Sequence, residues 1–307
     1  MNTTKFIISS LLMIPFFVLS FQASAQNEIS AADKIAAPQK LYHTDISLIV
    51  IIKSSNYSQA ASGKLELLNY HFFAEVFPKV GGQIENASIV RVGSGDEPSI
   101  FVPHNGPYYF EGGHFNSLEE VDTAFPNGNY VVNVKSPGGD IVDHVMTLTG
   151  DSGKTEIPAP ITISLIQENQ KIEVDKIDPK KELTVTWSEY TGARRDPNNI
   201  VHDMIFVVVA DCYGERIVHT GVPFVAQDYL TFNVSDHKIP AGTLRPGQPH
   251  SMYVEFPRAI DTAIVEGVPT FTSYETATYM DLHTLGEASG VACPDKLPPL
   301  DTGQTDR

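Results

Sequence analysis

The sequence is poor in several residue types that would point to a specific class of protein. Cysteine occurs twice and tryptophan once in 307 residues, so a cysteine-rich zinc site cannot form within the chain. Lysine and arginine number 21 against 37 aspartates and glutamates, which gives a formal net charge of −16. A chain this acidic repels phosphate backbones, and we therefore expect no nucleic-acid partner.

Long apolar runs are also absent, with one exception near the start of the chain. Lys5 precedes an apolar run at 6–21, and the small triplet Ala-Ser-Ala follows at 23–25. A positive start, a short apolar stretch and an A-x-A site are typical of a secretory signal peptide, so we predict a signal peptide at 1–25. No later run is long enough to cross a bilayer. The sequence thus predicts an exported protein, periplasmic or extracellular, without a stable membrane span after cleavage.

Export would allow the two cysteines to pair. Cys212 and Cys293 are the two cysteines of the sequence, and an even number of cysteines in an exported chain favours a disulfide over two unrelated thiols. The bond would close a loop of about 80 residues and stabilise the fold by about 4–5 kcal/mol in the chain-entropy model.

β-Strand signals dominate the chain after a polar, alanine-rich stretch at 26–40, which we expect to be a flexible leader. Segments rich in β-branched and aromatic residues, bounded by turn residues, predict a first series of strands at 43–52, 70–77, 87–92, 130–134 and 141–149. A second series is predicted at 161–166, 171–177, 183–187, 204–210, 216–220, 229–234, 252–256 and 276–283. A single short helix is expected after Ser117, which can serve as N-cap to Glu119 and Glu120.

Strands at this spacing, with turns between them, predict an all-β fold made of sandwiches. Proline cannot donate to a sheet ladder, so Pro158 and Pro160 favour a boundary between the two series. We therefore expect two β-sandwich domains, at 41–155 and 156–286, and a proline-rich tail at 287–307.

The second series resembles a fibronectin type III domain. Residues 183–190 read Leu-Thr-Val-Thr-Trp-Ser-Glu-Tyr, and Leu183, Val185 and Trp187 share one face, as in the second strand of that family with its core tryptophan. Residues 244–250 read Leu-Arg-Pro-Gly-Gln-Pro-His and resemble the entry to the sixth strand, with His250 in place of the tyrosine that forms a corner. The resemblance covers about 156–286 and implies insertions at 193–202 and 258–269.

The first series has a weaker resemblance to an immunoglobulin-like sandwich. Residues 125–130 read Phe-Pro-Asn-Gly-Asn-Tyr and enter a predicted strand, as at the corner of such a sandwich. The whole chain also resembles exported bacterial β-sandwich proteins. These resemblances imply a fold, and such folds serve adhesion, spacing and binding alike.

One stretch is rich in side chains suited to binding. His104, Tyr108, Tyr109, Glu111 and His114 lie close together among glycines and prolines. Aromatic rings on loops can stack on sugars, which makes these five residues our candidate ligand site. The alternative is that the rings fill the core of the first domain.

No intact catalytic motif accompanies these residues, so a non-catalytic exported binding protein is our first hypothesis, with a surface glycan or protein as partner. A hydrolase or lyase of extracellular polysaccharide, using Glu111 and His114, is the alternative, and a structural spacer is a third option. The ten histidines include no His-Glu-x-x-His and no tightly spaced pair, so we expect neither a metal nor a cofactor.

Overall fold

The computed structural model describes residues 41–225, 229–288, 290 and 292–301. The predicted signal peptide and leader, and the end of the tail at 302–307, lie outside these residues. The one helix of the described residues is α1 (Leu118–Ala124). Its N-cap is Ser117 as predicted, and the Ser117 hydroxyl accepts a 3.2 Å hydrogen bond from the backbone N–H of Glu120.

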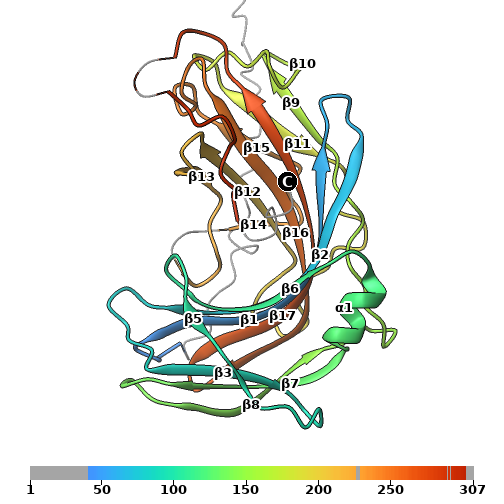
Figure 1. Ribbon diagram of the computed structural model, residues 1–307, viewed down its shortest axis with the longest axis vertical. Helices are drawn as coiled ribbons and strands as arrows, with labels where there is room; N and C mark the ends of the chain where they lie inside the picture. The colour runs from blue at the N-terminus through green and yellow to red at the C-terminus, as the bar shows by residue number, and fades with distance from the viewer. Residues whose placement is uncertain (1–40, 226–228, 289, 291, 302–307) are drawn as a thin grey trace, which may run out of the picture. The chain divides into compact units, whose positions relative to one another are not determined.

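The fold is all-β and rests on one large sheet (Figure 1). Its nine strands are β1 (Ile46–Gln59), β2 (Leu65–Pro78), β5 (Val102–Pro103), β6 (Tyr108–Phe115), β12 (Met204–Asp211), β13 (Arg216–His219), β14 (Leu230–Thr231), β16 (Pro249–Val265) and β17 (Val268–His283). The order across the sheet is β13-β12-β16-β17-β1-β2-β6-β5, and β14 pairs with β12. The pairing of β1 with β17 is parallel and joins the two ends of the chain.

Two four-stranded sheets complete the fold. The first has the order β4-β3-β7-β8 and is formed by β3 (Asn86–Arg91), β4 (Ser99–Ile100), β7 (Gly128–Lys135) and β8 (Ile141–Leu148). The second has the order β10-β9-β11-β15 and is formed by β9 (Ile163–Gln167), β10 (Gln170–Ile172), β11 (Leu183–Trp187) and β15 (Asp236–Ile239).

Both small sheets pack against the same face of the large sheet. Side chains of a strand alternate between its two faces. On β17, Tyr274 belongs to the core beneath the first small sheet, whereas Met280 and Leu282 belong to the core beneath the second. These residues are an even number of positions apart, so they share one face. Two sandwiches therefore lie side by side on a common sheet.

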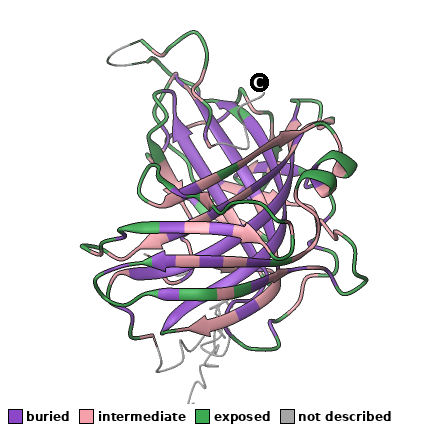
Figure 2. Cartoon of the chain, turned by 60° about the horizontal axis from the view of Figure 1, so that its bottom comes forward, coloured by how far each residue is buried: buried purple, intermediate pink, exposed green. Residues whose placement is uncertain are grey.

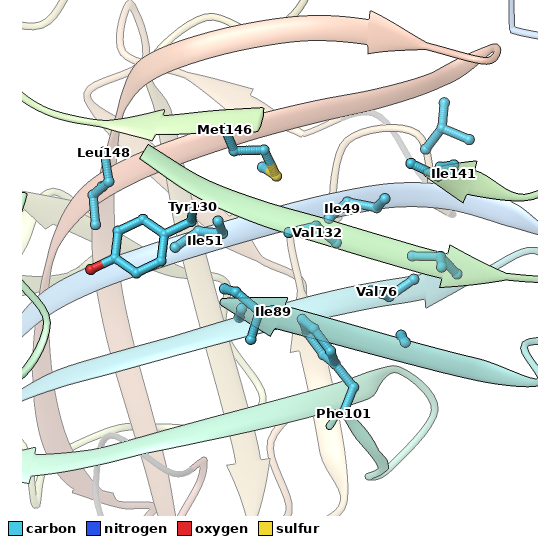
Figure 3. Packing of buried hydrophobic residues seen from close by; sticks show 14 of the residues in the cluster. Ile49, Ile51, Val76, Ile89, Phe101, Tyr130, Val132, Ile141, Met146 and Leu148 are labelled. Carbon is cyan, nitrogen blue, oxygen red and sulfur yellow. The ribbon is translucent and has the colours of Figure 1, made fainter. Parts of the chain in front are cut away.

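The core of the first sandwich is formed by apolar side chains of β3, β7 and β8 in the small sheet and of β1, β2 and β17 in the large sheet. Figure 3 shows Ile89, Val132 and Met146 of the small sheet facing Ile49 and Ile51 of β1. At the entry to β7 the Tyr130 hydroxyl donates a 2.7 Å hydrogen bond to the carbonyl of Pro126. The corner expected from the motif at 125–130 is confirmed.

The second sandwich has the strand arrangement expected of a fibronectin type III-like domain. Apart from the short β10 and β14, its first, second and fifth strands form the small sheet, and the other four lie in the large sheet. His250 occupies the corner, where its Nε2 accepts a 3.2 Å hydrogen bond from the backbone N–H of Arg245. Trp187 packs against this core but is only half-buried.

The segment at 258–269, expected as an insertion, extends the β16–β17 hairpin. The extension carries Val268 and Tyr274 into the core of the first sandwich. The division predicted at 155/156 thus separates the two small sheets, while the large sheet is common to both halves. Residues 158–161 lie against its middle, since Thr276 and Thr278 donate hydrogen bonds to the carbonyls of Pro158 and Ile161.

The central strands of the large sheet are buried on both faces (Figure 2). The second face of the sheet is covered in part by the segment after β13, through Val222 and Phe224, and by Leu300 near the C-terminus. The predicted disulfide between Cys212 and Cys293 is present and ties this C-terminal segment to the sheet. Among the described residues, no helix has both the length and the apolar character required to cross a membrane.

Candidate functional site

A cavity of about 420 Å³ lies on the second face of the large sheet, away from the two small sheets. Its walls come from β1, β2, β12, β13, β16 and β17, together with the segment between β5 and β6 and the C-terminal residues 299–301. The alternation of side chains along each strand explains why these residues face the same cavity. On β1, for example, Ile49 and Ile51 enter the first core, so Leu48, Val50 and Ile52 face the cavity.

The lining combines apolar and acidic side chains. The apolar side chains come from β1, β2, β12 and β17, namely Leu48, Val50, Phe77, Phe206 and Phe271. Leu48 pairs with Phe77 at the apolar end, and Ser54 pairs with Glu275 further along β1, at the polar end. Glu75 pairs with Val50 and Glu255 with Phe206, so acidic and apolar side chains are also direct neighbours. A cavity of this size with an apolar wall and a few convergent polar groups is the usual form of a small-molecule site.

Carboxyl groups crowd the polar end. Burial, together with the charges of Glu275 and Asp301, raises the pKa of Glu75 to about 8. Glu75 and Glu255 are half-buried, and both line the cavity. The protein around the cavity therefore encloses both carboxyls. At neutral pH Glu75 is therefore largely protonated.

Glu255 and Glu275 act as a pair. Burial raises the pKa of Glu255 well above its usual range, and the neighbouring Glu275 carboxyl adds to the effect. Burial also raises the pKa of Glu275, to about 7, although hydrogen bonds from Ser273 and Glu255 oppose the shift. The Ser273 hydroxyl lies 2.5 Å from Glu275 Oε1. Near pH 7 the pair accordingly holds a proton on Glu255, which donates to Glu275.

The remaining polar groups of the cavity offset little of the negative charge that these carboxyls carry when they ionise. Arg216 is the only lysine or arginine among the described residues that line the cavity. Burial, together with the charge of Arg216, lowers the pKa of His219 to about 4, so the imidazole is neutral at pH 7. Asp301 accepts a 2.6 Å hydrogen bond from the Tyr279 hydroxyl, which brings a fourth carboxyl to this end.

The five residues predicted as a ligand site lie in or beside β6, and they do not all face the cavity. The expectation of a loop is wrong for 108–115, which is a strand. Tyr108 packs into the first core and donates a 2.8 Å hydrogen bond to the carbonyl of Ile84. Tyr109, on the opposite face, is buried and lines the cavity. His104 is exposed at the cavity rim, with its ring centroid 5.4 Å from that of Tyr109.

A bulge in β6 brings the other two predicted residues together. Phe73 pairs with Glu111 and Phe72 with Gly113, so Gly112 is the extra residue. A Cβ on Gly112 would lie 2.6 Å from the Phe72 ring, and Gly113 has a φ of 107°, which favours glycine. Glu111 shares the face of Tyr109 by alternation, and the added residue places His114 on that face as well.

His71 of β2 completes this group. Its Nε2 lies 2.8 Å from Glu111 Oε1 and 3.3 Å from the Tyr109 hydroxyl. The ring centroids of His71 and His114 are 4.3 Å apart. His71 is almost fully buried, whereas Glu111 keeps 42% of its side-chain surface exposed. Burial lowers the pKa of His71 despite the Glu111 carboxylate, so at pH 7 the neutral ring forms a hydrogen bond rather than an ion pair with Glu111.

Sequence reasoning missed His71, Glu75, Glu255 and Glu275. A usable signal was present for His71, Glu75 and Glu255, because each interrupts an apolar or aromatic run, as in the Tyr-Val-Glu-Phe of 253–256. A charged residue inside a strand that is buried on both faces must face a polar site. The sequence did not show that these strands are buried on both faces.

Comparison with known proteins does not identify the function of the chain. No family model matches the chain, and no curated protein does. Among solved structures, the chain is similar to the FN1–FN3 domains of chicken CNTN1, with 10% sequence identity over 78% of this chain and 69% of that chain. The TM-score of 0.24 is too low for the two molecules to superpose as a whole. The sandwich assignment therefore rests on the strand order described above.

Proposed function

We propose that this protein is an exported, non-catalytic binding protein that encloses a small amphipathic ligand in the cavity of the large sheet. The observation that carries the proposal is the amphipathic lining, in which the apolar side chains of Leu48, Val50 and Phe271 share one cavity with the carboxyls of Glu75 and Glu275. β-Sandwich folds serve as binding and structural domains, and the cavity favours binding.

The apolar end supports a hydrocarbon or aromatic body in the ligand. Phe77, Phe206 and Phe271 offer large apolar faces beside the branched side chains of β1. Burying apolar surface against them is favourable by about 25 cal/mol per Å².

The acidic end supports a cationic head group. Four carboxyls from Glu75, Glu255, Glu275 and Asp301 face one guanidinium from Arg216. Carboxyls with raised pKa values ionise more readily when a cation approaches, because an opposite charge favours the charged form. An amine at this end would replace the bound protons and form charge-assisted hydrogen bonds.

Export is supported by two independent features. The pattern at 1–25 is typical of a signal peptide. The disulfide between Cys212 and Cys293 belongs to an oxidising compartment such as the periplasm or the cell exterior.

Three probes with the same aromatic body and different heads test the proposal: phenethylamine, phenethyl alcohol and hydrocinnamate. At pH 7 we expect the amine to raise the melting temperature most and the carboxylate least. A ligand at 100 times its Kd adds about 2.7 kcal/mol of stability. The variant Glu75→Gln should reduce the preference for the amine. Glu66→Gln, at an exposed position on the same strand, is the matched control and should retain it.

Other outcomes would redirect the assignment. A melting shift with neutral mono- or disaccharides, and none with the amine, would contradict the cationic head and support the glycan partner predicted from the aromatic residues. No shift with any probe at millimolar concentration would leave a structural spacer as the better explanation.

The carboxyl pair favours one second candidate, a hydrolase or lyase of extracellular polysaccharide. Glu255 and Glu275 have different proton affinities in one cavity, which is how acid and base roles are divided between two carboxyls. Incubation with a panel of polysaccharides, followed by assays for reducing ends and unsaturated products, tests this activity. Product formed by the natural protein and lost in Glu275→Gln would establish it.

A further inference from the structure

His71, Glu111 and His114 have the donor set of a metal centre. One ligand atom from each, two imidazole nitrogens and a carboxylate oxygen, lie within 4.8 Å of one another. Two histidines and one glutamate are the protein ligands of a well-known type of catalytic zinc site. Imidazole nitrogen suits zinc, copper, nickel and iron, whereas calcium and magnesium prefer oxygen ligands alone.

The backbone holds these three residues in place. His71 on β2 pairs directly with His114 on β6, so the two imidazoles extend side by side from neighbouring strands. Glu111 and His114 are three residues apart, and the bulge at Gly112 lets both project from one face, where Phe72 leaves no room for a residue larger than Gly112. Bulges often re-aim a side chain beside a functional site. The cluster therefore follows from strand pairing and not from the chance meeting of flexible surface side chains.

We propose that His71, Glu111 and His114 bind one divalent transition-metal ion, with Zn²⁺ as the representative ion. Three protein ligands leave a coordination position for water or another ligand. Tyr109 connects the metal-binding cluster with the cavity, because its hydroxyl lies 3.3 Å from His71 Nε2 and its side chain lines the cavity. The metal centre thus adjoins the cavity, but it does not depend on the ligand proposed for the cavity.

Metal binding is measured on the secreted, tag-free protein after treatment with a chelator. Equilibrium dialysis against micromolar Zn²⁺, followed by metal analysis, should give one ion per chain. Glu111→Gln and His114→Asn should each lose this ion at the same free concentration. His283→Asn, at an exposed position near the end of β17, is the control and should retain it. Circular dichroism and melting curves establish that each variant is folded.

A spectroscopic measurement separates this site from binding elsewhere. With Cu²⁺ as the probe, the electron paramagnetic resonance spectrum should show hyperfine coupling to two imidazole nitrogens, and to one in His114→Asn. Tyr109→Phe should weaken binding about 10–100-fold, as is usual when a group next to the ligands is removed. The proposal is overturned if the natural protein binds no Zn²⁺ at micromolar concentration, or if Glu111→Gln and His114→Asn bind as well as His283→Asn.

Discussion

Lys53 Nζ lies 2.6 Å from Asp122 Oδ1, and the Lys53 side chain has no exposed surface. The ammonium also donates hydrogen bonds to Asn127 Oδ1 and Thr155 Oγ1, at 3.1 and 3.4 Å. Burial lowers the pKa of Lys53, and Asp122 opposes the shift. The group thus joins the centre of β1 to α1 and to the segment that leads to the second sandwich.

Removing Asp122 should destabilise the protein more than removing Lys53. Asp122→Ala leaves a buried ammonium without its carboxylate, a change that costs about 3–5 kcal/mol for a fully buried pair. We expect a loss of stability of about 3 kcal/mol or less, because the Asp122 side chain is 36% exposed and Asn127 still accepts a hydrogen bond from Lys53. Lys53→Met replaces the charge with an apolar chain of similar length and should change stability by less. Urea unfolding measures both, and a larger loss in Lys53→Met would contradict this account.

The two sandwiches close their corners with different side chains, which allows a direct comparison. Tyr130→Phe removes one hydroxyl and its 2.7 Å bond to the Pro126 carbonyl, so a loss of about 1 kcal/mol is expected. His250→Phe removes the acceptor for Arg245 N–H and also the 3.1 Å contact of Nδ1 with the Gln248 carbonyl. Since His250 is fully buried, the expected loss is larger, about 1–3 kcal/mol. Thermal unfolding of the two variants tests the order, and equal stability of His250→Phe and the natural protein would exclude the corner role.

Local sequence signals predicted much of the fold. The motif at 183–187, the corner at His250 and the N-cap at Ser117 each depend on residues close together in the chain, and the structure confirms all three positions. Trp187 shows the limit of such reasoning. Alternation placed it correctly on the core face, yet it is half-buried because β11 ends there.

The shared sheet and the site could not be predicted in the same way. The polar residues of 53–59 look like a turn, but they continue β1 because β2 and β17 pair with them on both sides. Gly112 and Gly113 interrupt the alternation of β6, which led to the expectation of a loop. The cavity joins residues from β1, β2, β16 and β17, and their meeting depends on pairings between distant parts of the chain.

The acidic end of the cavity should make stability depend on pH. The folded-state pKa is about 8 for Glu75 and about 7 for Glu275, whereas an unfolded glutamate titrates near about 4.3. Between these values the folded state binds more protons than the unfolded state, so stability falls as pH rises. His219 has the opposite effect below about pH 6.5, because its folded pKa is lowered to about 4.

We therefore expect the free energy of unfolding to fall most clearly between about pH 6.5 and 8. The slope is up to about 1.4 kcal/mol per pH unit for each carboxyl that remains protonated in the folded state. Chemical unfolding at fixed ionic strength measures it. The double variant Glu75→Gln, Glu275→Gln should reduce the slope in this range to the part that Glu255 contributes, and Glu66→Gln should leave the slope unchanged. Stability that is constant or rising over this range in the natural protein would refute the raised pKa values.

The disulfide should act on both stability and the cavity. Cys212 and Cys293 are 81 residues apart, and opening a loop of this length should lower stability by about 4–5 kcal/mol in the chain-entropy model. The bond also anchors the segment that brings Leu300 and Asp301 to the cavity. Cys212→Ser, Cys293→Ser should therefore lower both the urea midpoint and the affinity for phenethylamine. Asp301→Asn, with the disulfide intact, should lower the affinity and change the midpoint less. If the double serine variant unfolds at the same urea concentration as the natural protein, the covalent link contributes nothing to the fold, and the C-terminal segment must be held by its packing alone.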